Sequence, residues 1–178
     1  LIFDNFLKSN FKKNSVWFDS KNIDKVENCK YAENWLKENS NKFLNILLEM
    51  PTRSINNLND EIWNTCIKKI SSIKNIEIAY YMPTNDLFIC SKEKITEIEK
   101  KNCNKKFLEI LEFLNKINIK NITFDYSGYN AINNFSKFSN FKWNIWHISS
   151  IEAFNKIISN NNIGIMLVTN NKFSNNLN

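Results

Sequence analysis

The sequence predicts an α/β fold, a (β/α) barrel-like parallel sheet of about six β/α units. Short apolar, β-branched runs alternate along the chain with longer stretches whose apolar residues recur with helical period. The links between them are short, so each helix must cross over before the next strand begins, and such crossovers require parallel strands. An open doubly wound sheet would fit the same pattern. That fold normally holds its ligand on a glycine-rich first turn, however, and the chain has only two glycines.

The first half of the chain predicts three strands and two helices. The strands are expected over 15–19, 43–49 and 76–82, because each of these runs is rich in Val, Ile, Leu or aromatic residues. The helices are expected over 24–38 and 58–70, where apolar residues lie three or four positions apart: Val26, Cys29, Ala32 and Leu36 in the first, and Ile62, Cys66 and Ile70 in the second. The segment 83–102 reads as an irregular, charged insertion, in which 91–101 suits a solvated helix.

The second half predicts three more strands, over 122–125, 142–148 and 163–169. The strongest helical pattern of the chain covers 105–115, and a weaker one covers 129–138. A capping box, Ser149-x-x-Glu152, begins a helix that runs to about 159. We therefore expect one domain over 1–170, followed by a polar tail over 171–178.

Composition excludes several classes of site. Two glycines cannot supply a dinucleotide-binding loop, a phosphate-binding P-loop or a nucleophile elbow, and one histidine cannot supply a zinc site with two histidines. The net charge is +6, but the sequence has 34 Asn and 23 Lys against one Arg, which is typical of AT-rich coding. The lysines are scattered between glutamates, so we expect no nucleic-acid partner.

The four cysteines, Cys29, Cys66, Cys90 and Cys103, show no C-x-x-C spacing and are expected to be free thiols. No run of 18 apolar residues and no apolar leader occurs in the chain, so we expect no transmembrane or signal segment. These patterns leave the compartment open.

Polar side chains follow the expected strands where each strand ends. They are Asp19 with Lys21, Glu49 with Arg53, Tyr81 with Asn85, Asp125 with Tyr126, His147, and Thr169 with Asn170. In a TIM barrel the carboxyl ends of the strands converge on one mouth, which is where such enzymes carry out their chemistry. The sequence therefore predicts a site at that mouth.

Two stretches resemble the glycerophosphodiester phosphodiesterase superfamily, the phospholipase-C-like barrels. Trp17-Phe-Asp-Ser-Lys-Asn22 is similar to a strand of that family that ends in an acid, one spacer and a lysine, and Trp143-Asn-Ile-Trp-His147 is similar to its penultimate strand. The resemblance implies that Asp19 binds a divalent cation, Ca²⁺ or Mg²⁺, that Lys21 contacts phosphate, and that the partner is a phosphodiester or a lipid headgroup.

The family's catalytic histidine pair and Glu-x-Asp lie upstream of the strand matched here, and the chain begins at Leu1. We therefore expect an N-terminally truncated or degenerate phosphodiester hydrolase-like domain that is inactive on its own. An alternative is a non-catalytic α/β module that binds a sugar or a phosphorylated ligand. Exposed sheet edges also make self-association possible.

Each site residue carries two interpretations. The functional one makes Lys21, Glu49 and His147 catalytic, makes Arg53, Tyr81, Asp125 and Trp146 substrate-binding, and makes Asp19 a metal ligand. The structural one makes Asp19 and Lys21 a salt bridge, Glu49 and Arg53 a pair that fixes a loop, and His147 a hydrogen-bonded structural residue. Trp146 would then be core, and Asp125 and Tyr126 a capped turn.

Overall fold

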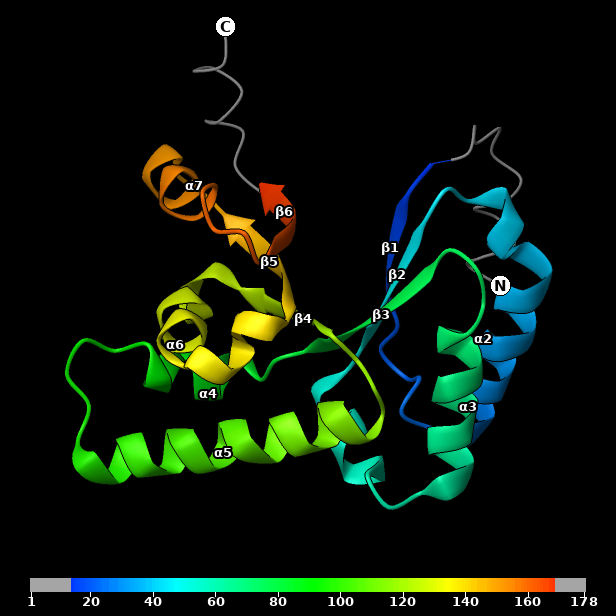
Figure 1. The fold of residues 1–178 in the computed structure, drawn as a ribbon, viewed down its shortest axis with the longest axis horizontal. Coiled ribbons are helices and arrows are strands. Elements are labelled where there is room, and N and C mark those ends of the chain that lie inside the picture. The colour runs from blue at the N-terminus through cyan, green and yellow to red at the C-terminus, as the bar shows by residue number, and fades with distance from the viewer. Residues whose placement is uncertain (1–13, 169–178) are drawn as a thin grey trace, which may run out of the picture.

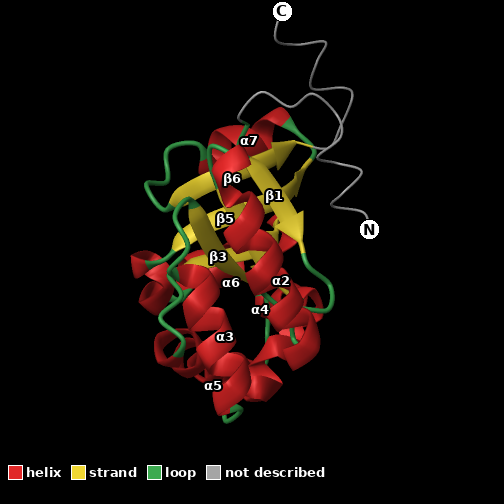
Figure 2. Cartoon of the chain, turned by 90° about the vertical axis from the view of Figure 1, so that its right-hand side faces the viewer, coloured by secondary structure: helices red, strands yellow, loops and turns green. Residues whose placement is uncertain are grey.

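The computed structural model describes residues 14–168, which form one curled parallel sheet with helices on its outer side (Figures 1 and 2). Six strands follow each other in the sheet in chain order: β1 (Val16–Asp19), β2 (Ile46–Met50), β3 (Ile76–Tyr81), β4 (Asn121–Asp125), β5 (Lys142–Ile148) and β6 (Ile163–Val168). Every ladder between neighbouring strands is parallel. The predicted (β/α) barrel-like fold is confirmed.

The helices connect these strands in the expected order. They are α2 (Val26–Asn39), α3 (Glu61–Ser71), α4 (Thr84–Cys90), α5 (Glu97–Lys116), α6 (Tyr129–Asn134) and α7 (Ile151–Ile157). Short 3-10 turns lie at Ser40–Lys42, Thr52–Asn57, Tyr126–Gly128 and Ser136–Asn140. In Figure 1, α2 and α3 lie side by side to the right of β1 and β2, and α5 runs along the lower edge of the molecule.

The sheet is curled strongly enough that side chains from strands that are not neighbours contact each other on its concave face. The indole rings of Trp17 on β1 and Trp146 on β5 lie 4.9 Å apart, although three strands separate β1 from β5 in the sheet order. Tyr81 on β3 also lies 6.3 Å from Trp146. These contacts require a concave face, which we call the inner face.

The main core lies between the outer face of the sheet and the helices. Side chains alternate along a strand, so every second strand residue faces the helices. The fully buried residues there include Ile46, Met50, Tyr80, Phe124 and Ile145 from the strands, and Trp63, Ile67, Ile110 and Phe113 from the helices. One polar group in this core has a clear partner: the indole N–H of Trp63 donates to the carbonyl of Ile23 at 2.8 Å.

Three local predictions are wrong. The segment 83–102 is not irregular, because α4 forms in it and α5 begins at Glu97, where Thr96 and Glu99 form a capping box. The helix α7 is capped by Ser150, which accepts a hydrogen bond from the amide of Ala153, and not by Ser149. The second strand begins at Ile46 rather than at 43.

The cysteines are not free. Cys29 is bonded to Cys66, and Cys90 to Cys103, so all four cysteines of the sequence form disulfides. Cys29 and Cys66 lie on facing sides of α2 and α3, and the second pair joins the end of α4 to α5. The prediction treated the cysteines as small apolar residues, because their sequence spacing does not reveal that they face each other. The predicted tail, 171–178, and the pair Thr169 and Asn170 lie outside the described residues.

Candidate functional site

The inner face is polar, unlike the inner face of a barrel packed only by aliphatic layers. Strand alternation places on it Trp17 and Asp19 of β1, Leu47 and Glu49 of β2, Glu77, Ala79 and Tyr81 of β3, Asn121, Thr123 and Asp125 of β4, and Lys142, Asn144 and Trp146 of β5. The register aligns Asp19 with Glu49, Tyr81 with Thr123, and Asp125 with Trp146. The predicted mouth residues of β1 to β5 thus lie along one end of the curled sheet.

Asp19 and Lys21 form an ion pair at the end of β1. Two residues that lie two apart near a strand end point to the same side, which brings the ammonium to the carboxylate. The pairing with Asp19 raises the pKa of Lys21. Because three quarters of the Lys21 side chain is exposed, its ammonium can still reach a ligand at the mouth.

Glu49 is a buried acid at the mouth end of the inner face, with 3% of its surface exposed. Burial raises its pKa to about 7, because the ionised carboxylate is poorly solvated there. The hydroxyl of Thr123 and the indole N–H of Trp146 lie close enough to oppose this shift in part, although neither makes a well-formed hydrogen bond. Glu49 can therefore gain or lose a proton near neutral pH.

His147 and Asp125 form a second titratable pair. His147 Nδ1 lies 2.5 Å from Asp125 Oδ2, and the other oxygen of Asp125 accepts from the amide of Ser127 at 2.9 Å. Burial alone would raise the pKa of Asp125, but the hydrogen bonds from His147 and Ser127 outweigh it, so the pKa lies below its usual value. The His147 side chain is 61% exposed.

The backbone at His147 is strained. Its φ is 55°, in the left-handed region that a histidine rarely adopts, and the register between β5 and β6 shifts between Ile145 and Ile148. A β-bulge of this kind redirects a side chain, and such strain is concentrated at functional sites. The bulge turns the imidazole toward Asp125 on the neighbouring strand.

Several buried polar atoms of the inner face have no hydrogen-bond partner among the described residues. They are Trp17 Nε1, Glu49 Oε2, Asn121 Oδ1, Thr123 Oγ1, Asn144 Oδ1 and Trp146 Nε1. An unpaired buried polar atom costs free energy, so such a group of donors and acceptors indicates a site that a ligand or water completes. Three of these residues, Asn121, Thr123 and Asn144, are absent from our sequence-based site. Their period-two placement in β4 and β5, beside Asp125 and Trp146, is the signal that could have revealed them.

Arg53 lies away from this group. Its Nε donates to Asp24 at 2.6 Å, and its Nη2 donates to the Asn22 side chain at 2.8 Å and to the carbonyl of Lys21. The guanidinium therefore fixes the loop after β1, with Asp24 rather than Glu49 as its acidic partner. Tyr81 also has a local partner, because its hydroxyl lies 2.7 Å from the hydroxyl of Thr84.

The residues present do not match a divalent cation site. No group of three or more His, Cys, Asp or Glu side chains within 14–168 could hold a metal ion. Asp19 is paired with Lys21, and Asp125 is paired with His147. The Ca²⁺ or Mg²⁺ that the resemblance implied therefore finds no group of three such side chains in this part of the chain.

A cavity lies beside β1 rather than at the centre of the inner face. It measures about 670 Å³ and lies between β1 and α2. Its apolar wall includes Phe18, Tyr31 and Trp35, and Asp19 and Lys21 lie at its polar end. The cavity thus reaches the mouth along the outer edge of the sheet.

Comparison with known proteins identifies the fold. A D-psicose 3-epimerase crystallised in the presence of D-fructose superimposes with a TM-score of 0.54 at 18% identity, over 88% of this chain and 63% of that one. The chain shares the fold of a sugar epimerase. A D-tagatose 3-epimerase-like protein matches with a TM-score of 0.49 at 13% identity, over 88% of this chain and 64% of that one. A protein from Thermus thermophilus, soaked with ZnCl₂, matches with a TM-score of 0.47 at 9% identity, over 87% of this chain and 65% of that one.

The chain therefore spans less than two thirds of the length of these solved structures. No protein-family model matches the sequence, and no curated protein matches it. No helix in the part of the chain described by the structure is long and apolar enough to cross a membrane.

The phosphodiesterase assignment is wrong. The solved structure that superimposes with a TM-score above 0.5 is a D-psicose 3-epimerase and not a glycerophosphodiester phosphodiesterase, so the expectation of a truncated hydrolase of that family is not supported. The motif that suggested the family, Asp19-x-Lys21, is an ion pair. Any strand ending in an acid, one spacer and a lysine can form such a pair, which is why so short a motif does not identify a family.

Proposed function

We propose that the inner face binds a small, uncharged, polyhydroxylated ligand of the sugar type, and that Glu49 exchanges a proton with it. One observation carries the proposal: buried polar atoms without partners surround a carboxyl whose pKa is about 7. Hydroxyl groups both donate and accept hydrogen bonds, so one sugar could pair with amide oxygens, a hydroxyl and indole N–H groups together.

The aromatic residues support the same ligand class. Trp17, Tyr81 and Trp146 gather at the mouth, with ring centroids 4.9 Å and 6.3 Å apart. Aromatic faces offer an apolar surface to the C–H groups of a sugar ring, and their N–H and O–H groups provide polar contacts at the rim. A phosphodiester would instead require a cluster of free cations, and Arg53 is engaged with Asp24.

Proton transfer is supported by two groups. A general acid or base works best when its pKa lies near the operating pH, and burial brings Glu49 to that range. His147 would act as the second proton carrier, with Asp125 holding Nδ1 and orienting the ring. Lys21 would contact ligand hydroxyls at the rim while it holds Asp19 in place. We leave a divalent cation out of the proposal, because no donor set for it exists within 14–168.

The test uses D-fructose and D-psicose as probes. Binding is followed by tryptophan fluorescence, since two indoles line the mouth. Proton exchange is followed by incubating the protein with either sugar in D₂O and measuring, by NMR, deuterium at the carbon next to the carbonyl. We expect saturable binding and enzyme-dependent deuteration, whose rate rises as the pH passes about 7 and Glu49 ionises.

The decisive variant is Glu49→Gln, which keeps the shape of the side chain and removes the proton acceptor. Deuteration should fall by about 10²-fold or more while binding changes little. Glu77→Gln is the matched control. Glu77 also lies on the inner face of the sheet, on β3, but its side chain is exposed and paired with Lys142 at 3.0 Å. Absence of binding to both sugars, or deuteration that survives in Glu49→Gln, would refute the proposal.

A further inference from the structure

The two disulfides have different places in the fold. Cys29–Cys66 joins α2 to α3, and thus the first β/α unit to the second. Cys90–Cys103 closes a short loop between α4 and α5, which both follow β3. The first bond therefore connects parts that are otherwise separate units of the barrel, whereas the second stays inside one connection.

The unit made of β1 and α2 lies at one edge of the described sheet. Its strand pairs with β2 alone, through four register pairs from Val16 to Asp19, and no strand of residues 14–168 lies on its other side. The cavity of about 670 Å³ separates that open side of β1 from α2. A strand with one partner and little packing on its free edge opens more readily than a central one.

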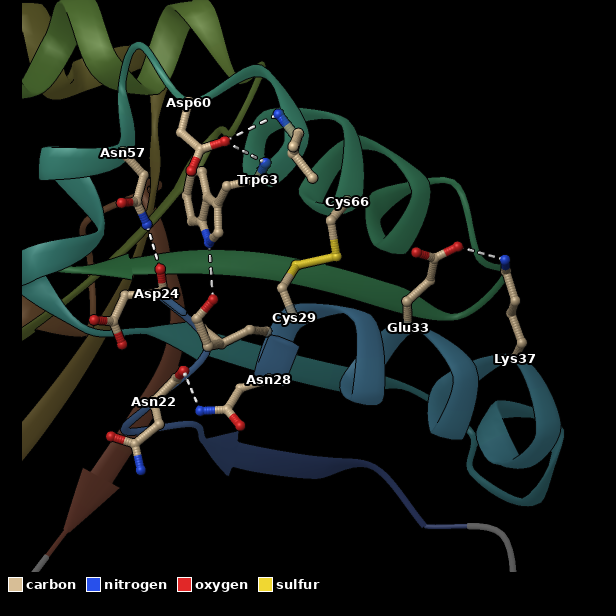
Figure 3. The surroundings of a disulfide bond; sticks show 12 residues. Asn22, Asp24, Asn28, Cys29, Glu33, Lys37, Asn57, Asp60, Trp63 and Cys66 are labelled. Carbon is tan, nitrogen blue, oxygen red and sulfur yellow. Dashed lines mark hydrogen bonds and ion pairs between the residues drawn. A yellow bond between two sulfur atoms is a disulfide. The ribbon is translucent and has the colours of Figure 1, made fainter. Parts of the chain in front are cut away.

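The β1–β2 ladder and Arg53 hold this unit to its neighbour, and a further group of contacts lies beside the disulfide (Figure 3). The indole N–H of Trp63 donates to the carbonyl of Ile23 at 2.8 Å, and the Asn57 side chain donates to the carbonyl of Asp24. Asp60 caps α3 by accepting from two of its first amides, at 3.0 Å each, which places Trp63. Figure 3 shows the bond between Cys29 and Cys66 spanning the two helices beside these contacts.

The bond also fixes the loop that carries the mouth residues. Cys29 lies in the first turns of α2 and is fully buried, and its amide donates to the carbonyl of Lys25 at 2.9 Å. Residues 20–25 make a short connection from β1 to α2, and Lys21 in this connection is paired with Asp19. Anchoring Cys29 therefore restricts the position of Asp19 and Lys21.

We infer that the protein folds in an oxidising compartment, where a disulfide donor closes both bonds, and that Cys29–Cys66 positions the β1–α2 unit and its Asp19–Lys21 pair on the barrel. Each bond forms by exchange with a small disulfide such as oxidised glutathione: the two protein thiols lose two protons and two electrons, and the donor is reduced to two thiols. A pair of structural disulfides is typical of proteins that mature outside the reducing cytosol.

The first measurement establishes the bonds. The full chain is refolded with a mixture of oxidised and reduced glutathione, and its peptides are mapped by mass spectrometry without reduction. We expect the pairs Cys29–Cys66 and Cys90–Cys103 and no free thiol after denaturation. Free thiols under these conditions, or a different pairing, would overturn the inference.

The second measurement tests the positioning role by hydrogen exchange. In Cys29→Ala/Cys66→Ala, amides of 16–19 and of the first turns of α2 should exchange about tenfold faster or more, while those of β4 and β5 keep their protection. Cys90→Ala/Cys103→Ala is the matched control and should leave 16–19 unchanged. Equal effects of the two double variants on 16–19, or no effect of the first, would overturn the positioning role.

If Cys29→Ala/Cys66→Ala does not fold, the wild-type chain is reduced in steps with dithiothreitol, and exchange is measured in the native state as each bond opens. Exchange at 16–19 should rise when Cys29–Cys66 opens and not when Cys90–Cys103 opens; the reverse order would contradict the inference. Neither readout requires a ligand, so the result is independent of the proposed sugar site.

Discussion

At the residue scale, the raised pKa of Glu49 makes the stability of the fold depend on pH. Its carboxyl is buried on the inner face and keeps its proton up to a pH of about 7, whereas an exposed glutamate loses it near 4.5. The folded chain therefore binds more protons than the unfolded chain between these two values. The free energy of unfolding must then fall as the pH rises through this window.

We predict that Glu49→Gln removes this pH dependence. In the wild type, the contribution of Glu49 to the free energy of unfolding should fall by about 3 kcal/mol between pH 4.5 and 7 and then stay constant. These limits are the pKa of an exposed glutamate, 4.5, and the raised pKa of Glu49, about 7. The Gln side chain carries no charge at any pH, so the variant should match the wild type at pH 5 and exceed it at pH 8. Urea unfolding at the two pH values measures the difference, with disulfides intact and Glu77→Gln as the control. A parallel pH dependence in wild type and Glu49→Gln would contradict the buried carboxyl.

Gly128 gives a second prediction at this scale. A Cβ at this position would lie 2.7 Å from Leu87 Cδ1 and 2.9 Å from Leu87 Cβ, and Leu87 is fully buried. The backbone of Gly128 is in the ordinary right-handed region, with φ −85°, which any residue can adopt. Glycine is therefore required at this position because a side chain does not fit, and not because of the backbone conformation. Gly128→Ala should lower the free energy of unfolding by about 1–3 kcal/mol through overpacking. The double variant Gly128→Ala/Leu87→Ala should show non-additive losses in urea unfolding, and simple additivity would argue against the contact.

At the element scale, the end of α5 is the best-defined boundary in the fold. Asn118 has φ 56°, its amide donates to the carbonyl of Asn115, and the amide of Ile119 donates to the carbonyl of Leu114 at 2.9 Å. This is the Schellman arrangement, in which a left-handed residue satisfies the last carbonyls of a helix. Asn tolerates that conformation better than most residues, and glycine tolerates it best.

We therefore predict that Asn118→Gly raises the free energy of unfolding by about 0.5–1 kcal/mol, and that Asn118→Ala lowers it by about 1 kcal/mol. Thermal unfolding followed by circular dichroism at a fixed pH would detect both shifts. Asn115→Ala serves as the control, since Asn115 lies one turn earlier in the regular helix. If glycine destabilised the helix end as alanine does, the conformational explanation would fail.

Elements differ in how far their sequences specify them. The strands were predictable because short apolar, β-branched runs such as 142–148 stand between longer stretches of helical period, and the mouth residues followed from where each strand ends. The helix α4 was missed because its seven residues, Thr84–Cys90, are too few to show a 3.6-residue period, and Pro83 and Asp86 favour a turn. The cap of α7 was misplaced by one residue because Ser149 and Ser150 offer the same hydroxyl, and only the backbone decides which one accepts.

At the scale of the whole molecule, contacts between distant elements could not be read from local patterns. The disulfide partner of Cys29 lies 37 residues away, with a complete strand between them, so spacing carries no information about the pairing. The same holds for the Asp125–His147 pair, which depends on a bulge in β5. The family assignment failed for a related reason, since it rested on local motifs rather than on the arrangement of the strands.

The two disulfides should contribute unequally to the free energy of unfolding of the chain. In the loop-entropy model, the bond that closes 37 residues stabilises by about 4 kcal/mol, and the bond that closes 13 by about 3 kcal/mol. Native stabilities are about 5–15 kcal/mol, so removing both bonds should leave a large fraction of the chain unfolded at 37 °C. Urea unfolding of the two double variants and of the quadruple variant, monitored by tryptophan fluorescence, measures each loss. Full stability of the quadruple variant would contradict this estimate.

The order of the strands has a consequence for the route by which the chain folds. Each ladder joins strands that are consecutive in sequence, so every new β/α unit can dock on the one before it, and no strand has to wait for a partner synthesised much later. The contact between Trp17 and Trp146 differs from these ladders, because it joins β1 to β5 across the inner face and forms only when the sheet has curled. Indole burial at that contact should therefore be the last step of refolding, slower than the appearance of secondary structure.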